Sequence, residues 1–229
     1  MPNSDTHGAD RVFLITGASS GIGEATARLA AKEGFRLVLA ARSKDKLDAL
    51  ADELGGPHRA IATACDVTNE KAVRDMVAAA RDHYGGIDIA LANAGRGTGA
   101  GDAEDWRSMI ELNVFGVVLT VKAVLDDLKR RNGHVVLLGS SAGRRPLPGS
   151  IYGATKWAIT GYGYNLREEL KGSGVRSTLI EPGMVDTPFF DSPKPDAMQA
   201  EDIAEAIVFA ITRPARVNIN EIWLTPKDG

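Results

Sequence analysis

The chain alternates between short apolar runs rich in β-branched residues and longer segments in which apolar residues recur at helical spacing. The apolar runs are typical of buried strands and occupy residues 12–16, 36–41, 60–64, 87–92, 135–138, 175–180 and 219–224. The segments with helical spacing occupy residues 22–33, 44–54, a stretch from a Thr68 cap to Gly85, 103–131, 152–171 and 201–210. Strands that alternate with helices are joined by right-handed crossovers and form a parallel sheet covered on both faces. We therefore predict a doubly wound, seven-stranded parallel sheet of the α/β class.

Length and composition favour one soluble globular domain. The 229 residues, 44% hydrophobic and 25% charged, suffice for one large core and contain no internal linker or repeat. We assign residues 11–229 to this domain and residues 1–10, which contain no apolar run, to a flexible N-terminal tail. The net charge of −3 provides no field that would draw the chain to nucleic acid or an anionic membrane, and no apolar stretch looks long enough to span a bilayer.

Cys65 is the one cysteine of the chain. A single cysteine excludes an internal disulfide, which is typical of a reducing compartment, so we expect a cytoplasmic protein by default. We interpret Cys65 as a small buried hydrophobic side chain near the end of a strand.

The first predicted strand runs directly into a glycine-rich segment, Thr16-Gly17-Ala18-Ser19-Ser20-Gly21-Ile22-Gly23. Glycines let a backbone turn tightly against a pyrophosphate, and the following helix offers free N–H groups and the positive end of its dipole. Glycine triplets also occur in ordinary tight turns. This triplet lies between the first strand and the first helix, where Rossmann-like sheets bind a dinucleotide, so we predict a dinucleotide site here.

The end of the second predicted strand bears on the choice of cofactor. NAD-binding sheets usually place an acidic residue there to bind the ribose 2′-hydroxyl. This chain has Ala41 followed by Arg42, whose planar guanidinium can bind a 2′-phosphate. The pattern favours NADP(H), against the alternative that Arg42 is an ordinary solvated residue at a strand end.

Tyr152 and Lys156 stand four residues apart in a predicted helix, which places both side chains on one face. A free tyrosine, with a pKa of about 10, is a poor acid or base at neutral pH. We expect the nearby ammonium of Lys156 to lower the pKa of Tyr152 and suit it to proton transfer. The alternative is an ordinary surface pair on a helix.

Further motifs follow the predicted strands in a fixed order. They are Asp66-Val67, Asn93-Ala94-Gly95, Asn113 in the long helix, Ser140, the segment Tyr152-Gly153-Ala154-Thr155-Lys156, and Pro182-Gly183 with Thr187. With the glycine-rich segment, these motifs resemble those of the short-chain dehydrogenases/reductases, in their single-domain NADP(H)-dependent branch. The resemblance extends from Arg11 to Pro226 and implies a Rossmann-like fold.

The resemblance also implies roles for these residues. Ser140 would hydrogen-bond the substrate oxygen, Tyr152 would exchange the proton, and Lys156 would hold the nicotinamide ribose. Asn113 would position a water of a proton relay. The remaining residues would contact the cofactor: Asp66 and Val67 at the adenine, Asn93, Ala94 and Gly95 along its wall, and Pro182, Gly183 and Thr187 at the carboxamide. No metal is implied.

Three features depart from the pattern of this family. Ser141 follows Ser140 directly, and the spacing to Tyr152 is one residue short, so Ser141 stays an alternative contact for the substrate oxygen. Ala92 stands where the family often has a second asparagine. The segment between Thr187 and Glu201, which covers the substrate in the family, is short and predicts an open pocket.

These observations together predict an oxidoreductase that interconverts a carbonyl and an alcohol on CH–OH groups. The substrate would be a small ketone, aldehyde or hydroxy compound, with a 3-hydroxy acid among the candidates, and the resemblance implies a homodimer or homotetramer. One alternative is a non-catalytic NADP-binding regulatory protein on the same fold. Another is epimerisation or dehydration at the same site.

Two groups of residues are candidates for shaping the substrate pocket. Met184, Phe189 and Phe190 follow the predicted carboxamide-binding segment and would form an apolar wall, unless they pack in the core. Arg96, Arg144 and Arg145 follow predicted strand ends and would attract an anionic substrate, unless they are solvated or paired with acids such as Asp105.

Overall fold

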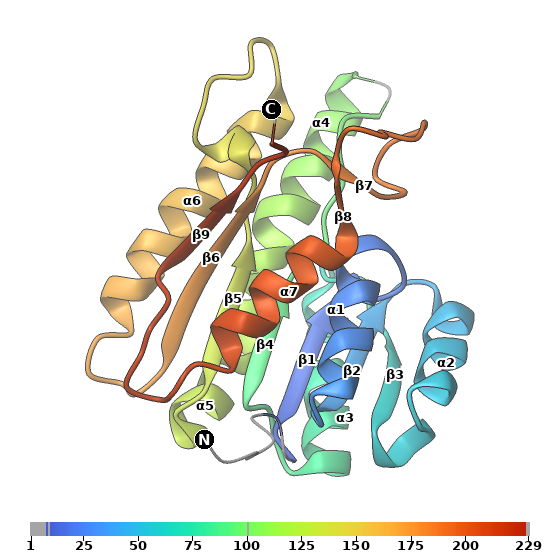
Figure 1. Ribbon diagram of the computed structural model, residues 1–229, viewed down its shortest axis with the longest axis vertical. Helices are drawn as coiled ribbons and strands as arrows, with labels where there is room; N and C mark the ends of the chain where they lie inside the picture. Colours follow the sequence, from blue (N-terminus) through green and yellow to red (C-terminus); the bar gives the residue numbers. More distant parts are fainter. Residues whose placement is uncertain (1–7, 9, 100, 228–229) are drawn as a thin grey trace.

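The computed structural model describes residues 8, 10–99 and 101–227 and contains one seven-stranded parallel sheet. The strands lie in the order β3-β2-β1-β4-β5-β6-β9 (Figure 1). Their bounds are β1 Val12–Thr16, β2 Arg36–Ala41, β3 Ala60–Ala64, β4 Ile89–Ala92, β5 His134–Leu138, β6 Arg176–Pro182 and β9 Glu221–Leu224. The order reverses direction between β1 and β4, which opens a crevice at the carboxyl ends of these strands. The predicted doubly wound, Rossmann-like sheet of a single domain is confirmed.

Helices cover both faces of the sheet. They are α1 Gly21–Lys32, α2 Lys44–Glu53, α3 Glu70–Tyr84, α4 Ala103–Ile110, α5 Gly116–Arg131, α6 Ile151–Glu169 and α7 Ala200–Ile211, with short turns η1 Gly56–His58, η2 Glu111–Phe115 and η3 Ser141–Gly143. Helices α1 and α7 pack against each other on the face that Figure 1 presents.

The strands supply two hydrophobic cores, one for each face. In β1, Phe13 and Ile15 face a core shared with α1, α2 and α7, while Val12 and Leu14 face a core shared with α3, α5 and α6. Alternate side chains of a strand point to opposite faces, so a strand buried on both sides is apolar at every position. This explains why the predicted strands appear as continuous apolar runs.

The predicted helices differ from the observed ones in two details, the capping residue of α3 and a π-helical turn between α4 and α5. The cap of α3 is Asn69, whose side chain accepts a hydrogen bond from the Ala72 N–H at 3.0 Å, and not Thr68 as predicted. Thr68 instead donates its hydroxyl to Asp66 at 2.8 Å. The predicted long helix 103–131 is continuous, but η2 is a π-helical turn that contains Asn113.

The helical stretch from α4 through α5 is apolar enough and long enough to cross a membrane by length and composition alone. The prediction that no such stretch exists is therefore wrong. In the structure α5 packs against β4 and β5, and Val121, Val124 and Leu128 are fully buried or nearly so. Trp106, Ile110 and Phe115 of the same stretch are exposed, so packing against the sheet accounts for only part of its hydropathy.

Two short strands flank the segment that leads to α7. β7 Val185–Asp186 and β8 Met198–Gln199 pair with each other and join the two ends of the intervening loop. These strands were not predicted from the sequence. Of the predicted N-terminal tail, only Gly8 and Asp10 belong to the described residues, and the rest of that prediction lies outside them.

Candidate active site

One cleft of about 740 Å³ runs across the carboxyl ends of the strands. It starts at Arg42 beyond β2, passes the glycine-rich turn after β1, and ends among Tyr152, Met184 and Phe189. It brings together nearly all of the predicted site residues: Gly17, Ser19, Ser20, Gly21, Ile22, Arg42, Asp66, Val67, Asn93, Ala94, Gly95, Ser140, Tyr152, Lys156, Pro182, Gly183 and Thr187. Gly23 and Asn113 lie behind this lining.

The glycine-rich turn is locked to the turn that follows β4. The Asn93 side chain donates to the Thr16 carbonyl oxygen at 2.8 Å, and the Thr16 hydroxyl accepts from the Asn93 N–H at 3.1 Å. Gly17 has a φ of +68°, and a Cβ at this position would lie 2.7 Å from the Asn93 side-chain nitrogen. The turn therefore requires glycine both for its backbone conformation and for this close approach.

Two helices that begin at the cleft, α1 and α2, lack the side-chain caps that several other helices have. Among the described residues, Ser20 at the start of α1 and Ser43 at the start of α2 make no side-chain capping hydrogen bond. By contrast, side chains of Asn69, Asp102 and Ser150 cap α3, α4 and α6. The first N–H groups of α1 and α2 are thus left for another acceptor, and both Ser20 and Ser43 line the cleft.

Charged and polar groups mark the end of the cleft near β2 and β3. The Asp66 carboxylate accepts hydrogen bonds from the Thr68 N–H at 3.0 Å and hydroxyl at 2.8 Å, which lower the pKa of Asp66; nearby Arg42 lowers it further. Cys65 is buried, as predicted, and burial raises the pKa of its thiol to about 11. Cys65 is therefore an uncharged wall of the cleft.

Tyr152 and Lys156 share the cleft-facing side of the first turns of α6. The Lys156 ammonium donates to the Leu138 carbonyl oxygen at 3.0 Å and lies 5.7 Å from the centre of the Tyr152 ring. Burial lowers the pKa of Lys156 to about 8. The Ser150 hydroxyl caps α6 by accepting from the Gly153 N–H at 3.1 Å, which fixes the turn that carries Tyr152.

The predicted lowering of the Tyr152 pKa by Lys156 is wrong. Burial raises the pKa of Tyr152, and the Ser140 hydroxyl offsets only part of this rise. Lys156 is not among the groups that lower the pKa, although its ammonium lies 5.7 Å from the centre of the Tyr152 ring. Tyr152 is thus held as a neutral phenol.

Of the two candidate serines, Ser140 is the one whose hydroxyl acts on Tyr152 and opposes the rise of its pKa. The Ser140 hydroxyl also accepts from the Ala142 N–H at 3.1 Å, since Ser140 caps the short turn η3. Ser141 lies within that turn and is buried beside the cleft.

Asn113 lies in the π-helical turn and holds the loop that follows β4. Its side-chain amide donates to the Arg96 carbonyl oxygen at 2.9 Å, and its side-chain oxygen accepts from the Arg96 N–H at 2.9 Å. The same amide donates to the Thr155 hydroxyl on α6 at 3.2 Å. Asn113 therefore joins the loop of β4 to the helix that carries Tyr152.

Apolar side chains surround the far end of the cleft. The Phe189 ring centre lies 5.5 Å from that of Tyr152 and 5.1 Å from that of Phe190. Phe189, Met184 and Leu147 are 41%, 49% and 49% exposed, so they rim the cleft and are not part of the core. The predicted apolar wall is present at these positions.

Two of the three arginines predicted to attract an anion are already paired. Arg144 forms ion pairs with Glu181 and Glu221. Arg96 forms an ion pair with Asp105 at 2.6 Å and donates to the Ser108 hydroxyl at 2.7 Å. The prediction of a guanidinium cluster is therefore wrong.

Arg145 remains at the cleft mouth, where it is exposed. The buried acid Glu181 was missed by sequence reasoning. A glutamate directly before Pro182, in an otherwise apolar strand, is the signal that could have identified it. Within the described part of the chain, no group of three or more His, Cys, Asp or Glu side chains is placed to hold a metal.

Known proteins resemble this chain over nearly its whole length. The sequence profile of the family described as short chain dehydrogenase matches residues 11–197. An uncharacterized oxidoreductase of Staphylococcus epidermidis is 38% identical over 226 residues, which cover 95% of this chain and 97% of that protein.

Solved structures agree with this match. An alcohol dehydrogenase from the archaeon Thermococcus sibiricus, complexed with 5-hydroxy-NADP, has a TM-score of 0.88 at 34% identity and covers 95% of this chain and 97% of its own. The serine dehydrogenase from Escherichia coli has a TM-score of 0.86 at 36% identity and covers 95% and 99%.

Proposed function

Since this chain belongs to the short-chain dehydrogenase/reductase family of oxidoreductases, we propose that it interconverts a carbonyl and an alcohol with NADP(H). The observation that carries the proposal is a cleft that starts at Arg42 and ends where Ser140, Tyr152 and Lys156 lie together. A cleft at the carboxyl ends of the strands is where a Rossmann-like sheet binds a dinucleotide, and Tyr152 lies at its far end as the proposed proton donor.

The residues of the cleft suit a dinucleotide. The Gly17–Gly23 turn forms a backbone cradle in which a Cβ at Gly17 would clash, and the uncapped N–H groups of α1 face it. We assign the adenine to Asp66 and Val67, and the wall to Asn93, Ala94 and Gly95. Lys156 would bind the ribose, and Pro182, Gly183 and Thr187 the carboxamide. When bound, NADP(H) supplies or accepts the hydride.

Two features support NADP(H) over NAD(H). Ala41 stands where an acid would bind a 2′-hydroxyl, and the Arg42 side chain next to it is exposed at the cleft. Next to it, the N-terminus of α2 lacks a side-chain cap and offers N–H groups to an anion. A 2′-phosphate would satisfy both groups together. The Thermococcus sibiricus relative was solved with an NADP derivative.

We propose that Tyr152 gives its proton to the carbonyl oxygen during reduction. Its raised pKa keeps the phenol protonated at neutral pH, as a donor requires. Ser140, which lines the cleft beside Tyr152, would donate to the same oxygen as negative charge develops there. Lys156 is fixed by the Leu138 carbonyl at a distance from which it can bind a ribose hydroxyl and stabilise the phenolate that forms.

For Asn113 the contacts favour a positioning role. Both ends of its side-chain amide are used by Arg96 and Thr155, so a relay water would be held by the backbone of the π-helical turn. Asn113 sets the distance between the loop after β4 and α6. We therefore assign Asn113 to the site as a positioning residue.

We propose a neutral ketone, aldehyde or alcohol with an apolar substituent as the substrate. Leu147, Met184 and Phe189 expose apolar surface around Tyr152, which a substrate would cover. Arg96 and Arg144 have their charges compensated by acids. A hydroxy acid, as the likeness to a serine dehydrogenase suggests, is the competing class.

We also propose assembly into a homodimer or homotetramer, consistent with large exposed apolar side chains away from the cleft. These are Trp106, Ile110, Phe115, Trp157, Phe209 and Trp223. Light scattering on the purified protein measures this directly. Localisation in the cytoplasm stays a prediction.

The experiment that tests the function follows NADPH oxidation by the purified protein across a panel of ketones and aldehydes, with identification of the alcohol formed. Tyr152→Phe, which removes only the hydroxyl, should lower turnover by about 10²- to 10⁴-fold while the Kd for NADPH changes little. Tight NADPH binding without any turnover would favour the regulatory alternative. Conversion of a substrate without net NADPH oxidation would favour epimerisation or dehydration.

A further inference from the structure

A buried carboxylate, Glu181, lies directly beneath the candidate active site. It is the next-to-last residue of β6, directly before Pro182, and is fully buried. One of its oxygens accepts from the Thr160 hydroxyl at 2.6 Å, and the other is paired with the Arg144 guanidinium. Glu181 thus contacts both α6 and the segment that follows Ser140.

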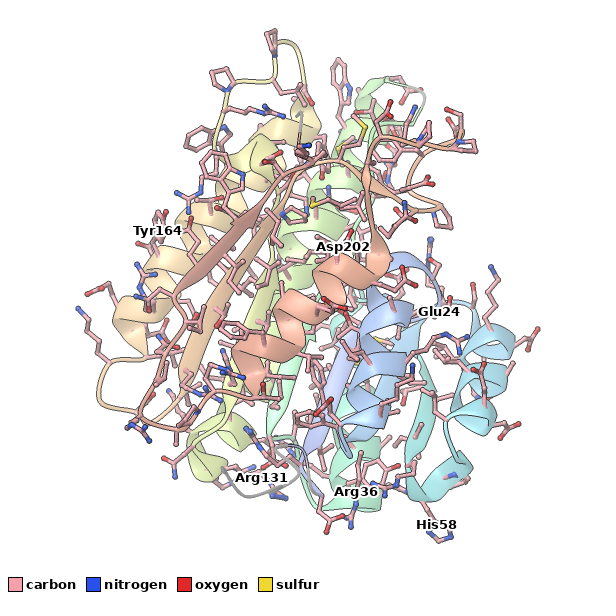
Figure 2. The ribbon with its side chains drawn as sticks, in the orientation of Figure 1. Glu24, Arg36, His58, Arg131, Tyr164 and Asp202 are labelled. Carbon is pink, nitrogen blue, oxygen red and sulfur yellow. The ribbon has the colours of Figure 1, made fainter. Side chains whose placement is uncertain are left out.

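Arg144 lies between two acids. Its guanidinium pairs with Glu181 on β6 and with Glu221 on β9, and its central carbon lies 5.3 Å from the centre of the Tyr164 ring. The Tyr164 hydroxyl donates to Glu221 at 3.2 Å, and Tyr164 lies on α6 (Figure 2). Arg144 therefore joins the serine turn η3 to two strands and one helix.

The serine turn packs directly on the backbone of α6. A Cβ at Gly143 would lie 2.5 Å from the Thr160 hydroxyl and 2.7 Å from the Lys156 carbonyl oxygen. The Arg144 N–H donates to the Ser141 carbonyl oxygen at 3.0 Å. A shift of Arg144 would therefore move the turn that carries Ser140 against the turn of α6 that carries Lys156.

Stability alone does not account for this cluster. Burying a carboxylate and a guanidinium costs solvation that an apolar pair of similar volume would not. Burial raises the pKa of Glu181, although hydrogen bonds from Thr160 and Arg144 oppose the rise. Burial would lower the pKa of Arg144. The hydrogen bonds to Glu181 and Glu221 outweigh this effect, so the pKa of Arg144 is raised. The cluster is thus held together by its ion pairs.

We propose that Arg144, Glu181 and Glu221 form a positioning cluster that sets Ser140 against Tyr152 and Lys156. Three parts of the site meet at Glu181: the serine turn through Arg144, α6 through Thr160, and the carboxamide segment through the chain itself. The Ser140 hydroxyl also lies 3.4 Å from the Pro182 carbonyl oxygen, beside that segment. The inference rests on the proposed function, because it explains how the proposed proton donor and its partner are aligned.

The test compares four variants of the full-length protein. Arg144→Met removes the charge, Arg144→Lys keeps it without the planar fork, and Glu181→Gln keeps a similar shape without the charge. Arg167→Met is the control, because the Arg167 guanidinium stacks on the same Tyr164 ring, at 5.2 Å, without contacting the serine turn or its acids. Each variant is measured for kcat per NADPH-binding site, for NADPH Kd and for Tm.

We expect Arg144→Met and Glu181→Gln to lower kcat per binding site by about 10- to 100-fold, since a small misplacement of catalytic groups has effects of this size. Arg144→Lys should recover part of the loss. NADPH Kd should stay within about threefold, because the phosphate cradle lies elsewhere, and Arg167→Met should match the wild type in kcat.

A purely structural role would give another result. Tm and the fraction of protein that binds NADPH would fall, while kcat per binding site stayed at the wild-type value; this would overturn the inference. If Arg144→Met does not fold, Arg144→Lys and Glu181→Gln decide by the same criterion. A wild-type protein that turns over no carbonyl would refute the proposed function, whereas an active wild type with unaffected variants refutes only the positioning cluster.

Discussion

The two ends of the cleft are formed by different parts of the chain, backbone at one end and side chains at the other. The end assigned to the cofactor consists largely of backbone at strand ends, locked by hydrogen bonds such as those between Thr16 and Asn93. The end assigned to the substrate consists of exposed side chains on connecting segments, such as Leu147 and Phe189. Backbone fixed by a sheet tolerates little change, whereas exposed side chains can be exchanged at little cost in stability. We therefore expect the protein to be strict about its cofactor and tolerant about its substrate.

The largest effect is expected where the two ends meet. Ser140→Ala should lower kcat by about 10²- to 10³-fold, the usual loss of one donor to a developing oxyanion. Ser141→Ala is the matched control, since Ser141 does not bond Tyr152, and should lower kcat less than about threefold. Steady-state kinetics at saturating NADPH measures both, and equal losses would show that the turn does not distinguish the two serines.

A variant of Lys156 would measure how much the buried ammonium lowers the stability of the folded protein. Burial lowers the pKa of Lys156 from 10.5 to about 8, so the folded protein carries a charge penalty below pH 8 on the order of 3 kcal/mol. Between these pKa values the unfolded chain binds more protons, so stability should rise with pH across that window.

Lys156→Met should remove this rise, although it leaves the Leu138 carbonyl oxygen without its donor. The measurement is urea unfolding of both proteins at several pH values, read as the difference between them. The buried-cation interpretation would be contradicted if the stability of the wild type minus that of Lys156→Met did not increase from pH 8 toward pH 10.5. Turnover of the variant should fall as well.

The cofactor end should respond to a change of charge at β2. Ala41→Asp combined with Arg42→Leu should shift the preference from NADPH toward NADH by about ten- to a hundredfold, because a charge-assisted contact is worth about 1.5–3 kcal/mol. The ratio of kcat/KM for the two cofactors is the measurement. A wild type that already prefers NADH would refute the assignment of Arg42.

The substrate end should change its selectivity without losing its fold. Phe189→Ala removes an aromatic ring that is 41% exposed, so Tm should move by only about 1–2 °C. Relative kcat/KM for bulky and small ketones should change by about tenfold, since this ring adjoins Tyr152. A large fall in Tm with unchanged selectivity would place Phe189 in the core.

The smallest effect is expected from Arg145. It is exposed at the cleft mouth, where a single charge is well screened, so Arg145→Ala should change the preference for a methyl ester over its carboxylate by less than about threefold. The assay compares kcat/KM for both compounds at low and high salt. A strong preference for the carboxylate that salt and this variant abolish would establish an anionic substrate.

The predicted site residues that the structure brings into one cleft share one property: their signal in the sequence is local. The glycine-rich turn and the Tyr152–Lys156 pair are set by spacing within a few residues, and the structure brings both to the same cleft. The cap of α3 was misplaced by one residue because Thr68 and Asn69 are both residue types that cap helices, and in the structure Thr68 bonds Asp66 while Asn69 caps the helix.

Properties that depend on distant partners were not predictable from the sequence. Arg144 looked free because Glu181 and Glu221 reach it only through the order of β5, β6 and β9 in the sheet. The pKa of Tyr152 was misjudged because the burial that raises it depends on how α6 packs. Charge and burial at a site are consequences of the assembled fold.

The short pair of β7 and β8 has a consequence for how new specificities arise in this scaffold. The Met198 N–H donates to the Met184 carbonyl oxygen at 3.1 Å, so the loop between residues 187 and 197 starts and ends at a fixed junction. Because the entropy of closing a loop grows only slowly with its length, insertions there would cost little. Recombination could therefore lengthen or replace the segment that we propose to cover the substrate, while the residues around Tyr152 keep their positions.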